Sequence, residues 1–478
     1  MVGEPIILDW RTWLRGMSSG TELDDGGFSP DTEGVNLITE PGVVHAPAAR
    51  VDSDTDNRLT GTIIASSPDH ATFLGDNRLL IGSDTDEDGT FYRYDGTKII
   101  AAAYATDTTN NYAEGFTSII NYKGESYVTT KELIKRWIST GTISDLSGGG
   151  FTNTTFPHPA IVFEDNAYYG DGNLLLRQTA ANGSPATILT LPSNDLIIAL
   201  GVDPGTGKML IATTSSLNIS GTVPSRNLLQ WYDGESSTVT KYVDVGEIIN
   251  SFYNVGSTVF VGYGNNLGFV NGSGVQFLRR LKNVTFTQQE LPYFGKITNI
   301  GNTLYVVDGD QVLAYGEILP GQKIFYYCLQ NKASSDKFTA IFDAGNGSGS
   351  DTRKLGIAHE TSVPAYLFNT VDLTDISGLD KFFFMTDWVY FPRPVTITNL
   401  QLEFFSDIVS TGNLSVIAFD SERDTHTIAS LDGTITNRRV IRKMGGFPKR
   451  VDAIRFQIEN STTNAGLKRL LIYRKVLE

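Results

Sequence analysis

The sequence predicts an all-β chain, with a β-propeller of about seven blades followed by a C-terminal β-sandwich. Short apolar runs separated by polar turns recur along most of the 478 residues, and 48 glycines supply turn positions. None of these runs has the 3.6-residue apolar period of a long amphipathic helix. After about residue 376 the repeat gives way to longer runs in which apolar and polar residues alternate. The repeat therefore defines a first domain, and its loss marks a second.

Residues 299–317 show the repeat unit most clearly. An apolar run at 304–307 (LYVV) is followed by the polar turn DGD at 308–310 and by a second apolar run at 312–315 (VLAY). Two short strands joined by a tight Asp/Gly turn form a β-hairpin. We therefore expect each unit to contribute a hairpin to a small antiparallel sheet.

Seven such units occur along the chain. The turn residues that precede their first strands are Asn77, Glu125, Asn166, Gly207, Ser257, Asn302 and Lys354, so the spacings are 48, 41, 41, 50, 45 and 52 residues. A period of roughly 40 to 50 residues made of strands alone is typical of propeller blades. An ordinary β-sandwich is the alternative, but seven copies exceed what one sandwich uses.

The chain divides into three segments on this basis. Residues 1–50 contain Trp10 and Trp13, which suit a docking arm, and two short extended runs at 35–38 and 42–45. A closed propeller usually needs a strand from one terminus to complete the last blade, because an open blade leaves an unpaired edge. We expect residues 1–50 to close the ring near 352–369, residues 51–376 to form the propeller, and residues 377–478 to form the sandwich.

One acidic loop in the propeller matches the spacing of a calcium-binding loop. Asp84, Asp86 and Asp88 alternate before Gly89, and Asp95 occupies the twelfth position. Carboxylates at i, i+2 and i+4 around a tight turn can converge on one hard cation. The same residues also suit a solvated hairpin tip, in which Asp and Gly serve turn geometry alone. Calcium at these four aspartates is the one cofactor that the sequence suggests.

Other candidate motifs do not develop into a catalytic pattern. The glycine-rich segment at 201–208 has Thr206 and Met209 where a phosphate loop needs Gly and Ser or Thr, and it reads better as a hairpin turn. The single cysteine, Cys328, lies in an apolar run and is expected to be a buried small hydrophobe. The five histidines, His45, His70, His158, His359 and His426, have no metal-ligand spacing.

The C-terminal segment has the pattern of a sandwich. Leu400 and Leu402 alternate with Gln401 and Glu403, and residues 454–459 alternate in the same way. Basic residues cluster between two of its strands, where they suit either a solvated loop or an acidic partner; these are Arg438, Arg439, Arg442, Lys443, Lys449 and Arg450.

The net charge of −15 is unevenly distributed. Residues 377–478 contain 14 Lys and Arg against 11 Asp and Glu, whereas residues 1–376 contain 24 against 42, a net charge of −18. An acidic body is a poor phosphate binder, so we expect no affinity for nucleic acid. No apolar stretch approaches the 18 residues of a membrane span, and the N-terminal residues lack a signal-peptide pattern. We therefore expect no membrane-spanning segment.

This layout resembles that of tail proteins of short-tailed bacteriophages, particularly the propeller-bearing tail hub or nozzle that continues the portal channel. The resemblance rests on EGVNLITEPGVVHAP before the first blade, on degenerate repeats such as GNTLYVVDGDQVLAYGE, and on the final FFFMTDWVYFPRPVTITNLQLEFF, AIRFQIEN and LLIYRKV. It implies a non-enzymatic structural protein of the virion tail, assembled in the host cytoplasm. It also implies a ring, most commonly a hexamer, that retains DNA and guides it without sequence-specific binding. The implied partners are portal or adaptor proteins and tail fibres or spikes.

Two other function classes remain open at the level of sequence. One is a propeller that binds or cleaves glycans and carries a carbohydrate-binding sandwich, and the other is a cellular propeller scaffold that binds a protein. A hydrolase would gather carboxylates and aromatic side chains at one end of the central channel. A ring subunit would instead present large contact surfaces on its sides.

Overall fold

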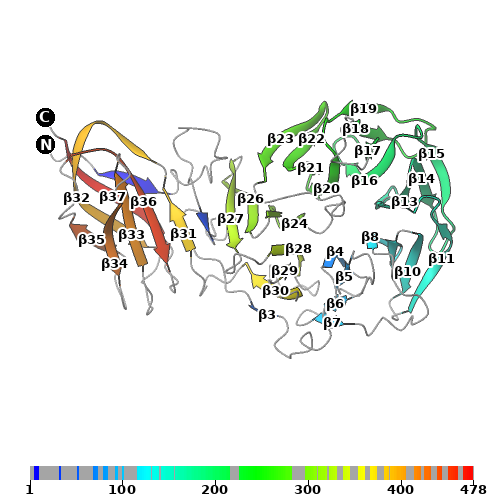
Figure 1. Cartoon of the computed structure of the whole chain (residues 1–478), viewed down its shortest axis with the longest axis horizontal. Helices are drawn as coiled ribbons and strands as arrows, with labels where there is room; N and C mark the ends of the chain where they lie inside the picture. The colour runs from blue at the N-terminus through cyan, green and yellow to red at the C-terminus, as the bar shows by residue number, and fades with distance from the viewer. Residues whose placement is uncertain are drawn as a thin grey trace.

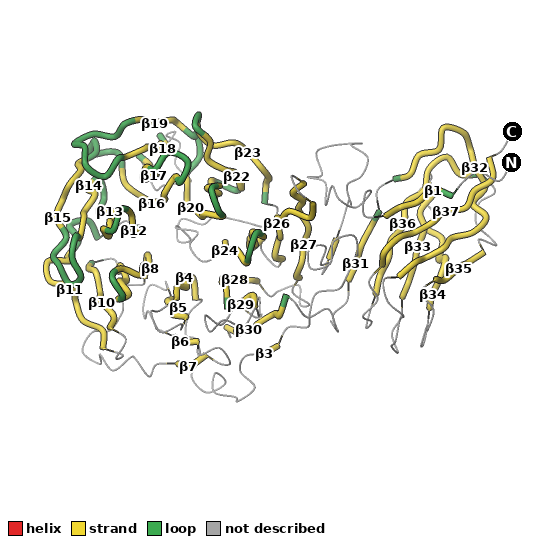
Figure 2. Tube along the Cα trace, turned by 180° about the vertical axis from the view of Figure 1, so that it is seen from behind, coloured by secondary structure: helices red, strands yellow, loops and turns green. Residues whose placement is uncertain are grey.

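The computed structural model consists of strands and turns over the residues that it describes, with no helix among them (Figures 1 and 2). The described residues are 5–9, 32–33, 51–52, 68–73, 79–83, 92–94, 99–101, 116–130, 132–138, 142–154, 157–215, 226–281, 297–308, 311–319, 322–330, 337–344, 354–360, 366–373, 382–386, 388–404, 414–420, 425–431, 439–443, 450–460 and 467–476. The all-β prediction is confirmed. Within these ranges no helix is long and apolar enough to cross a membrane.

Seven four-stranded antiparallel sheets follow one another along the chain, and we number them sheets 1 to 7. Sheet 1 contains β4 (Pro68–Phe73), β5 (Leu79–Ser83), β6 (Tyr92–Tyr94) and β7 (Ile99–Ala101). Sheet 2 contains β8 (Phe116–Tyr122), β9 (Glu125–Thr130), β10 (Leu133–Ile138) and β11 (Thr142–Gly150). Sheet 3 contains β12 (Ala160–Phe163), β13 (Asn166–Asp171), β14 (Leu174–Gln178) and β15 (Ala186–Thr190). Sheet 4 contains β16 (Leu196–Asp203), β17 (Lys208–Thr214), β18 (Asn227–Tyr232) and β19 (Lys241–Asp244).

The remaining three sheets continue this order. Sheet 5 contains β20 (Ile249–Val255), β21 (Thr258–Tyr263), β22 (Asn266–Asn271) and β23 (Gly274–Arg280). Sheet 6 contains β24 (Ile297–Ile300), β25 (Thr303–Asp308), β26 (Gln311–Leu319) and β27 (Gln322–Gln330). Sheet 7 contains β28 (Lys337–Asp343), β29 (Lys354–Glu360), β30 (Tyr366–Asp372) and β3 (Val51–Asp52).

The seven sheets form a closed ring around their first strands (Figure 1). Each first strand contacts the first strand of the next sheet, in the cycle β4, β8, β12, β16, β20, β24, β28 and back to β4. Seven sheets stacked radially around an axis are the architecture of a propeller. The predicted propeller, with its seven blades, therefore agrees with the structure.

Residues of the predicted repeat unit explain why the blades stack. In β25, Leu304 and Val306 join a cluster with sheet 5, whereas the alternate residues Tyr305 and Val307 join a cluster with sheet 7. All four side chains are buried, because each face of the blade meets a neighbouring sheet. The continuous apolar run LYVV thus reflects burial on both faces of one strand.

A strand from the N-terminal part of the chain completes sheet 7. Val51 and Asp52 pair with Thr370 and Asn369 of β30. Closure was expected within residues 1–50, but the pairing strand follows directly after them, and the segments 35–38 and 42–45 lie outside the described residues. The closing strand sits here because it immediately precedes sheet 1 in the chain, so the first and last sheets become neighbours.

Two earlier strands belong to the C-terminal sheet instead. β1 (Ile6–Asp9) pairs with β37 (Leu467–Val476), and β2 (Thr32–Glu33) pairs with β31 (Phe382–Met385). The expectation that residues 1–50 close the propeller and provide a docking arm did not include these two pairings with the sandwich. β1 pairs with the C-terminal sheet because its apolar side chain Leu8 packs in the C-terminal core, where it is only 3% exposed.

The C-terminal sheet contains nine strands: β1, β2, β31, β32 (Val389–Phe404), β33 (Leu414–Asp420), β34 (Thr425–Leu431), β35 (Arg439–Lys443), β36 (Val451–Asn460) and β37. β32 changes partners along its length. Val389 and Tyr390 pair with β36, Val395 pairs with both β36 and β37, and the residues after it pair with β37; the register with β36 shifts between Tyr390 and Val395. Pro392 and Pro394 occupy the shift, where proline avoids the cost of a lost ladder hydrogen bond.

This change of partners folds the sheet into two layers that share β32. Leu400 and Leu402 of one layer lie in the same buried cluster as Ile454 and Phe456 of the other. The leucines thus occupy the sandwich core as predicted, whereas Gln401 and Glu403, which alternate with them, are also buried. The same cluster continues into sheets 6 and 7, so the ring and the sandwich share buried side chains.

Candidate functional site at the junctions between neighbouring sheets

The four aspartates of the predicted calcium loop, Asp84, Asp86, Asp88 and Asp95, lie outside the described residues. In the part of the chain that is described, no three His, Cys, Asp or Glu side chains are placed to hold a metal ion. The loop therefore stays a prediction.

Two other motifs from the sequence have structural roles. Residues 203–208 form the expected hairpin turn, with Asp203 opposite Lys208. The Asp203 carboxylate accepts hydrogen bonds from Thr206 Oγ1 at 2.8 Å and Trp231 Nε1 at 3.1 Å. Burial opposes ionisation of this carboxyl, but the hydrogen bonds outweigh it and lower the pKa of Asp203. Asp203 thus joins its own turn to the third strand of sheet 4.

His158 and Cys328 are enclosed by the fold. The His158 ring stacks on Phe151 with 3.7 Å between the ring centroids, and its Nδ1 lies 2.8 Å from the Gly170 carbonyl oxygen. Cys328 is buried, and its Sγ donates to the Val312 carbonyl at 3.3 Å. Burial raises the pKa of the Cys328 thiol, which disfavours the nucleophilic thiolate.

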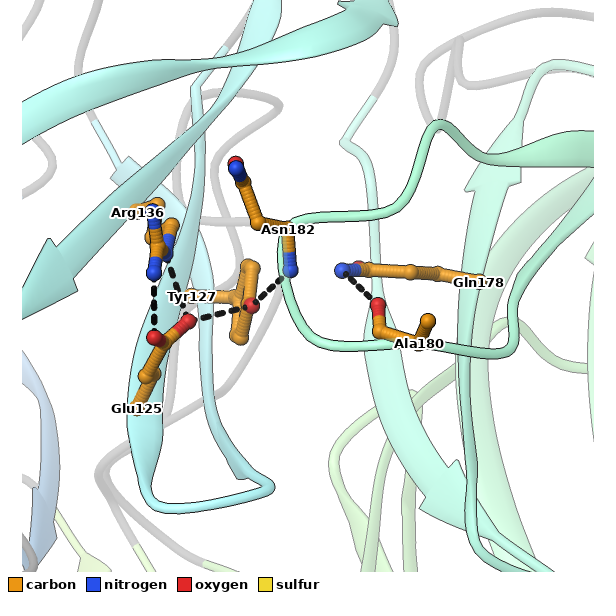
Figure 3. Close-up of polar contacts among 6 residues, drawn as sticks. All are labelled: Glu125, Tyr127, Arg136, Gln178, Ala180 and Asn182. Atoms are coloured by element: carbon orange, nitrogen blue, oxygen red, sulfur yellow. Dashed lines mark hydrogen bonds and ion pairs between the residues drawn. The ribbon is translucent and has the colours of Figure 1, made fainter.

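A polar network joins sheet 2 to sheet 3 (Figure 3). Tyr127 on β9 lies directly opposite Arg136 on β10. The guanidinium of Arg136 binds both carboxylate oxygens of Glu125. Tyr127 donates its hydroxyl proton to Glu125 at 2.7 Å and accepts the backbone N–H of Asn182 at 3.0 Å. The network thus extends from two strands of sheet 2 to a turn of sheet 3.

The turn of sheet 3 is shaped to make this contact. Asn182 has a φ of 55°, in the left-handed region that asparagine tolerates better than most residues. Gln178 accepts from the hydroxyl of Tyr169 at 2.7 Å and donates to the Ala180 carbonyl at 3.0 Å. These bonds hold the turn between β14 and β15, so the N–H of Asn182 faces Tyr127 (Figure 3).

The charges in this network have defined states. Arg136 lowers the pKa of Glu125 through its hydrogen bonds, so the carboxylate stays ionised near neutral pH. Burial raises the pKa of Tyr127, and it raises that of Tyr169 well above its ordinary value. Both tyrosines are therefore neutral hydrogen-bonding groups under ordinary conditions.

A second junction repeats this arrangement between sheets 3 and 4. Tyr168 on β13 lies opposite Arg177 on β14. Arg177 Nη1 donates to Glu235 Oε1 at 2.7 Å and to the Gly234 carbonyl at 3.3 Å, both in the turn between β18 and β19. In both junctions, a Tyr–Arg pair on the second and third strands of one sheet lies against the last turn of the next sheet.

The next junction uses a different cation, which lies on the fourth strand of its sheet. Lys241 on β19 lies 4.5 Å from the centroid of the Trp231 ring and donates to the carbonyl oxygen of Gly272, in the last turn of sheet 5. Between sheets 5 and 6 the contact is aromatic, with the Phe260 and Tyr315 rings edge to face at 5.9 Å. A cation or an aromatic ring thus joins successive sheets along this part of the ring.

The sequence contained a signal for the first two junctions. Tyr127 and Tyr168 are 41 residues apart, as are Arg136 and Arg177, which equals the spacing of the repeat markers Glu125 and Asn166. The repeat was identified from its apolar runs, so the matching 41-residue spacing of the tyrosines and the arginines was missed.

The predicted basic cluster of the sandwich lies partly on a strand. Arg439, Arg442 and Lys443 lie on β35, and Arg450 is exposed.

The Tyr127–Glu125 pair can be compared with the tyrosine nucleophile that the glycan-cleaving alternative would need. A tyrosine that donates to a carboxylate is the arrangement in which tyrosine acts as a nucleophile in some glycosidases. Here Tyr127 is fully buried, its oxygen already accepts a backbone N–H, and its pKa is raised. A nucleophile needs access to its substrate and a lowered pKa, so this pair serves to join sheets.

Comparisons with known proteins report similarity of shape alone. No protein-family model matches the chain, and no curated protein matches it. Among solved structures, the chain is similar to the extracellular domain of a B. thetaiotaomicron protein named as a one component system, with 8% identity and a TM-score of 0.47, over 88% of this chain and 59% of that one. It is also similar to a chain of the mitotic checkpoint complex, with 11% identity and a TM-score of 0.43, over 70% of this chain and 94% of that one. Likeness at this level indicates no function.

Proposed function

We propose that the chain is a non-enzymatic structural protein of a virion, an oligomeric tail hub or nozzle component of a short-tailed bacteriophage. The observation that carries this proposal is the way the N-terminal strands connect the two domains. β1 and β2 pair within the C-terminal sheet, and β3 completes sheet 7. One buried cluster also runs from sheets 6 and 7 into the sandwich. A tail component must keep its parts aligned under load, and such a connected subunit suits that task.

The charge distribution supports the same proposal. Residues 1–376 carry 42 acidic against 24 basic residues, so the propeller repels DNA phosphates. DNA could then pass such a ring without adhering to it. We propose that the subunits form a ring, a hexamer by resemblance, and that this ring contacts portal or adaptor proteins and tail fibres or spikes.

Mass and location test this proposal directly. The full chain, purified without other virion proteins, is expected to give closed rings in electron micrographs and a light-scattering mass near six times the 52.2 kDa of one chain. Antibodies to the chain should label the tails of virions in immunogold micrographs. Virions whose protein content, measured by mass spectrometry, lacks the chain would contradict the proposal.

Exposed aromatic side chains favour a glycan-binding function as the second candidate. Tyr242, Phe277 and Tyr390 are 68%, 55% and 63% exposed. Sugar rings stack on such side chains, and carbohydrate-binding surfaces commonly use them. Titration of the full chain with a panel of soluble hexasaccharides would test this function, because saturable heat of binding that is lost in an aromatic-to-alanine variant would support it.

A further inference from the structure

One outward face of the C-terminal sandwich carries a group of aromatic and cationic side chains. We call it the Tyr390 face, and it consists of Trp388, Tyr390, Ile417, Phe419 and Arg455. On β36, Ile454 and Phe456 are fully buried in the core, so Arg455 between them points to the opposite side. The same alternation applies on β33, where Val416 and Ala418 are buried. The five side chains therefore share the solvent side of one layer.

The centre of this face is preorganised. The guanidinium carbon of Arg455 lies 4.9 Å from the ring centroids of both Trp388 and Phe419. Cation–π attraction to both rings holds the guanidinium in place. Tyr390 stands beside this stack and is 63% exposed, and Ala453, directly opposite it, is too small to cover its ring. An exposed aromatic side chain thus lies next to a fixed cation.

The chemistry of the face favours a protein over a glycan. Sugar recognition needs free ring faces, but Arg455 occupies one face each of Trp388 and Phe419. Tyrosine, tryptophan and arginine gathered in one patch are instead the composition of protein-binding hot spots. Because few rotamers remain to be fixed, such a patch loses little entropy on binding.

Charge indicates which protein surface would fit. The C-terminal segment has a net charge of +3, from 14 basic and 11 acidic residues, and the rest of the chain has −18. A contact between the sandwich of one copy and the propeller of another brings opposite charges together, whereas contacts between like domains bring like charges together. A contact between two different surfaces is heterologous, and such contacts generate rings when the rotation closes.

We propose that the Tyr390 face binds the propeller of a second copy of this chain. This inference rests on the proposed function and deepens it, since it names the surface that would join neighbouring subunits of the ring. It also accounts for the exposure of Tyr390 in the isolated chain.

The first experiment compares the mass of two matched variants of the full chain. Tyr390→Asp removes the ring and adds a charge that the acidic propeller repels, whereas Ile7→Asp adds the same charge at an exposed apolar residue on β1 of the same sandwich, outside the Tyr390 face. Light scattering over a dilution series should show that Tyr390→Asp dissociates at a concentration about tenfold higher or more, as truncation of a hot-spot residue predicts. Ile7→Asp should behave as the parent chain. Equal assembly of both variants, or equal dissociation of both, would overturn the proposal.

The second experiment identifies the occupant. Tyr390→Cys is labelled with a photoreactive maleimide, which leaves Cys328 unmodified because that thiol is buried. Isotopically heavy and light copies are mixed before irradiation, and mass spectrometry reads the linked peptides. Links from position 390 to residues 1–376 of another copy support the proposal. Links confined to one copy, or to residues 377–478 of another, overturn it, as would Tyr390-dependent binding of soluble hexasaccharides by a monomeric chain.

These results separate this inference from the proposed function. If virions contain the chain and Tyr390→Asp still assembles like the parent, the proposed function stands and the inference fails. If Tyr390→Asp alone prevents assembly but virions lack the chain, the interface stands and the proposed function fails.

Discussion

The hydroxyl oxygen of Tyr127 lies 3.0 Å from the backbone nitrogen of Asn182, although the two residues are 55 positions apart in the chain. This bond crosses from sheet 2 to sheet 3, and Tyr127 is fully buried. A propeller has no chain connection between the outer parts of neighbouring blades other than the loops, so side chains must hold those parts together. The Tyr127 junction is such a connection, because the hydroxyl of Tyr127 bonds to Glu125 in sheet 2 and to Asn182 in sheet 3.

Replacing Tyr127 by phenylalanine should weaken this junction. The change keeps the ring but removes the donor to Glu125 and the acceptor for the Asn182 N–H. A buried group left without its partner costs about 1 to 3 kcal/mol, and we expect a loss of that size in the free energy of unfolding. Urea denaturation measures it. Tyr242→Phe, at a tyrosine that is 68% exposed, is the control and should stay within about 0.5 kcal/mol of the parent.

Hydrogen exchange would show whether this loss arises at the junction. The Asn182 amide should exchange faster in Tyr127→Phe, while amides of β25 in sheet 6 keep their parent rates. Unchanged protection at Asn182 would mean that the hydroxyl does not hold the turn.

Acidification should reveal the ion pair of the same junction. The folded-state pKa of Glu125 is lowered, chiefly by Arg136. Its stabilising contribution is therefore fully present above the unfolded-state pKa and is lost as the pH falls through the folded-state pKa. The parent chain should be more stable than Glu125→Gln at neutral pH, and the difference should shrink as the pH is lowered from about 5 to about 3.

Glu235→Gln provides the comparison for this pH series. Glu235 pairs with Arg177, but its side chain is 73% exposed, against 16% for Glu125. Solvent screens an exposed pair, so its removal should change stability by less than about 1 kcal/mol at every pH. A larger pH-dependent effect at Glu235 than at Glu125 would contradict the assignment of the buried pair as the stronger one.

The sequence predicted those parts of the fold that depend on neighbours in the chain. The hairpin of β25 and β26, the turn at 203–208 and the core positions of Leu400 and Leu402 follow from local patterns, and each appears in the structure, although Gln401 and Glu403 between and after the leucines are buried as well. Local patterns are readable because the pairing partner lies a few residues away.

The features that sequence reasoning missed depend on distant partners. β1 has four residues and β2 has two, too few for a periodic pattern, and their partners lie more than 300 residues away. The Tyr–Arg pairs were not predicted because their partners lie in a turn of the next blade, 55 or more residues further along the chain.

The loop at residues 84–95 supplies a prediction about metal removal. If Asp84, Asp86, Asp88 and Asp95 bind calcium, a chelator should lower the melting temperature. The expected loss is about 2.7 kcal/mol when the ion was present at about 100 times its dissociation constant. Asp86→Asn should abolish the response to calcium while leaving the chelated form as stable as the parent. A melting temperature that is insensitive to both chelator and calcium would show that the loop is a hairpin turn only.

Stepwise truncation of the N-terminal segment should separate its two structural roles. Removing residues 1–33 deletes β1 and β2, so β37 gains an unpaired edge and the core loses Leu8. Removing residues 1–52 also deletes β3, which leaves β30 of sheet 7 as an edge strand. Unpaired edges expose backbone groups and invite aggregation, so the longer truncation should be the less soluble of the two.

Hydrogen exchange in β30 distinguishes these roles. We expect the β30 amide that points at β3, within the pair Asn369 and Thr370, to keep its protection in the chain lacking residues 1–33, because β3 remains, and to lose it in the chain lacking residues 1–52. Amides of β37 should lose protection in both, because β1 is absent from both. Equal protection of β30 in the two truncated chains would show that Val51 and Asp52 are not what closes the ring. In that case the connection between propeller and sandwich would have to rest on the shared buried cluster of sheets 6 and 7 alone.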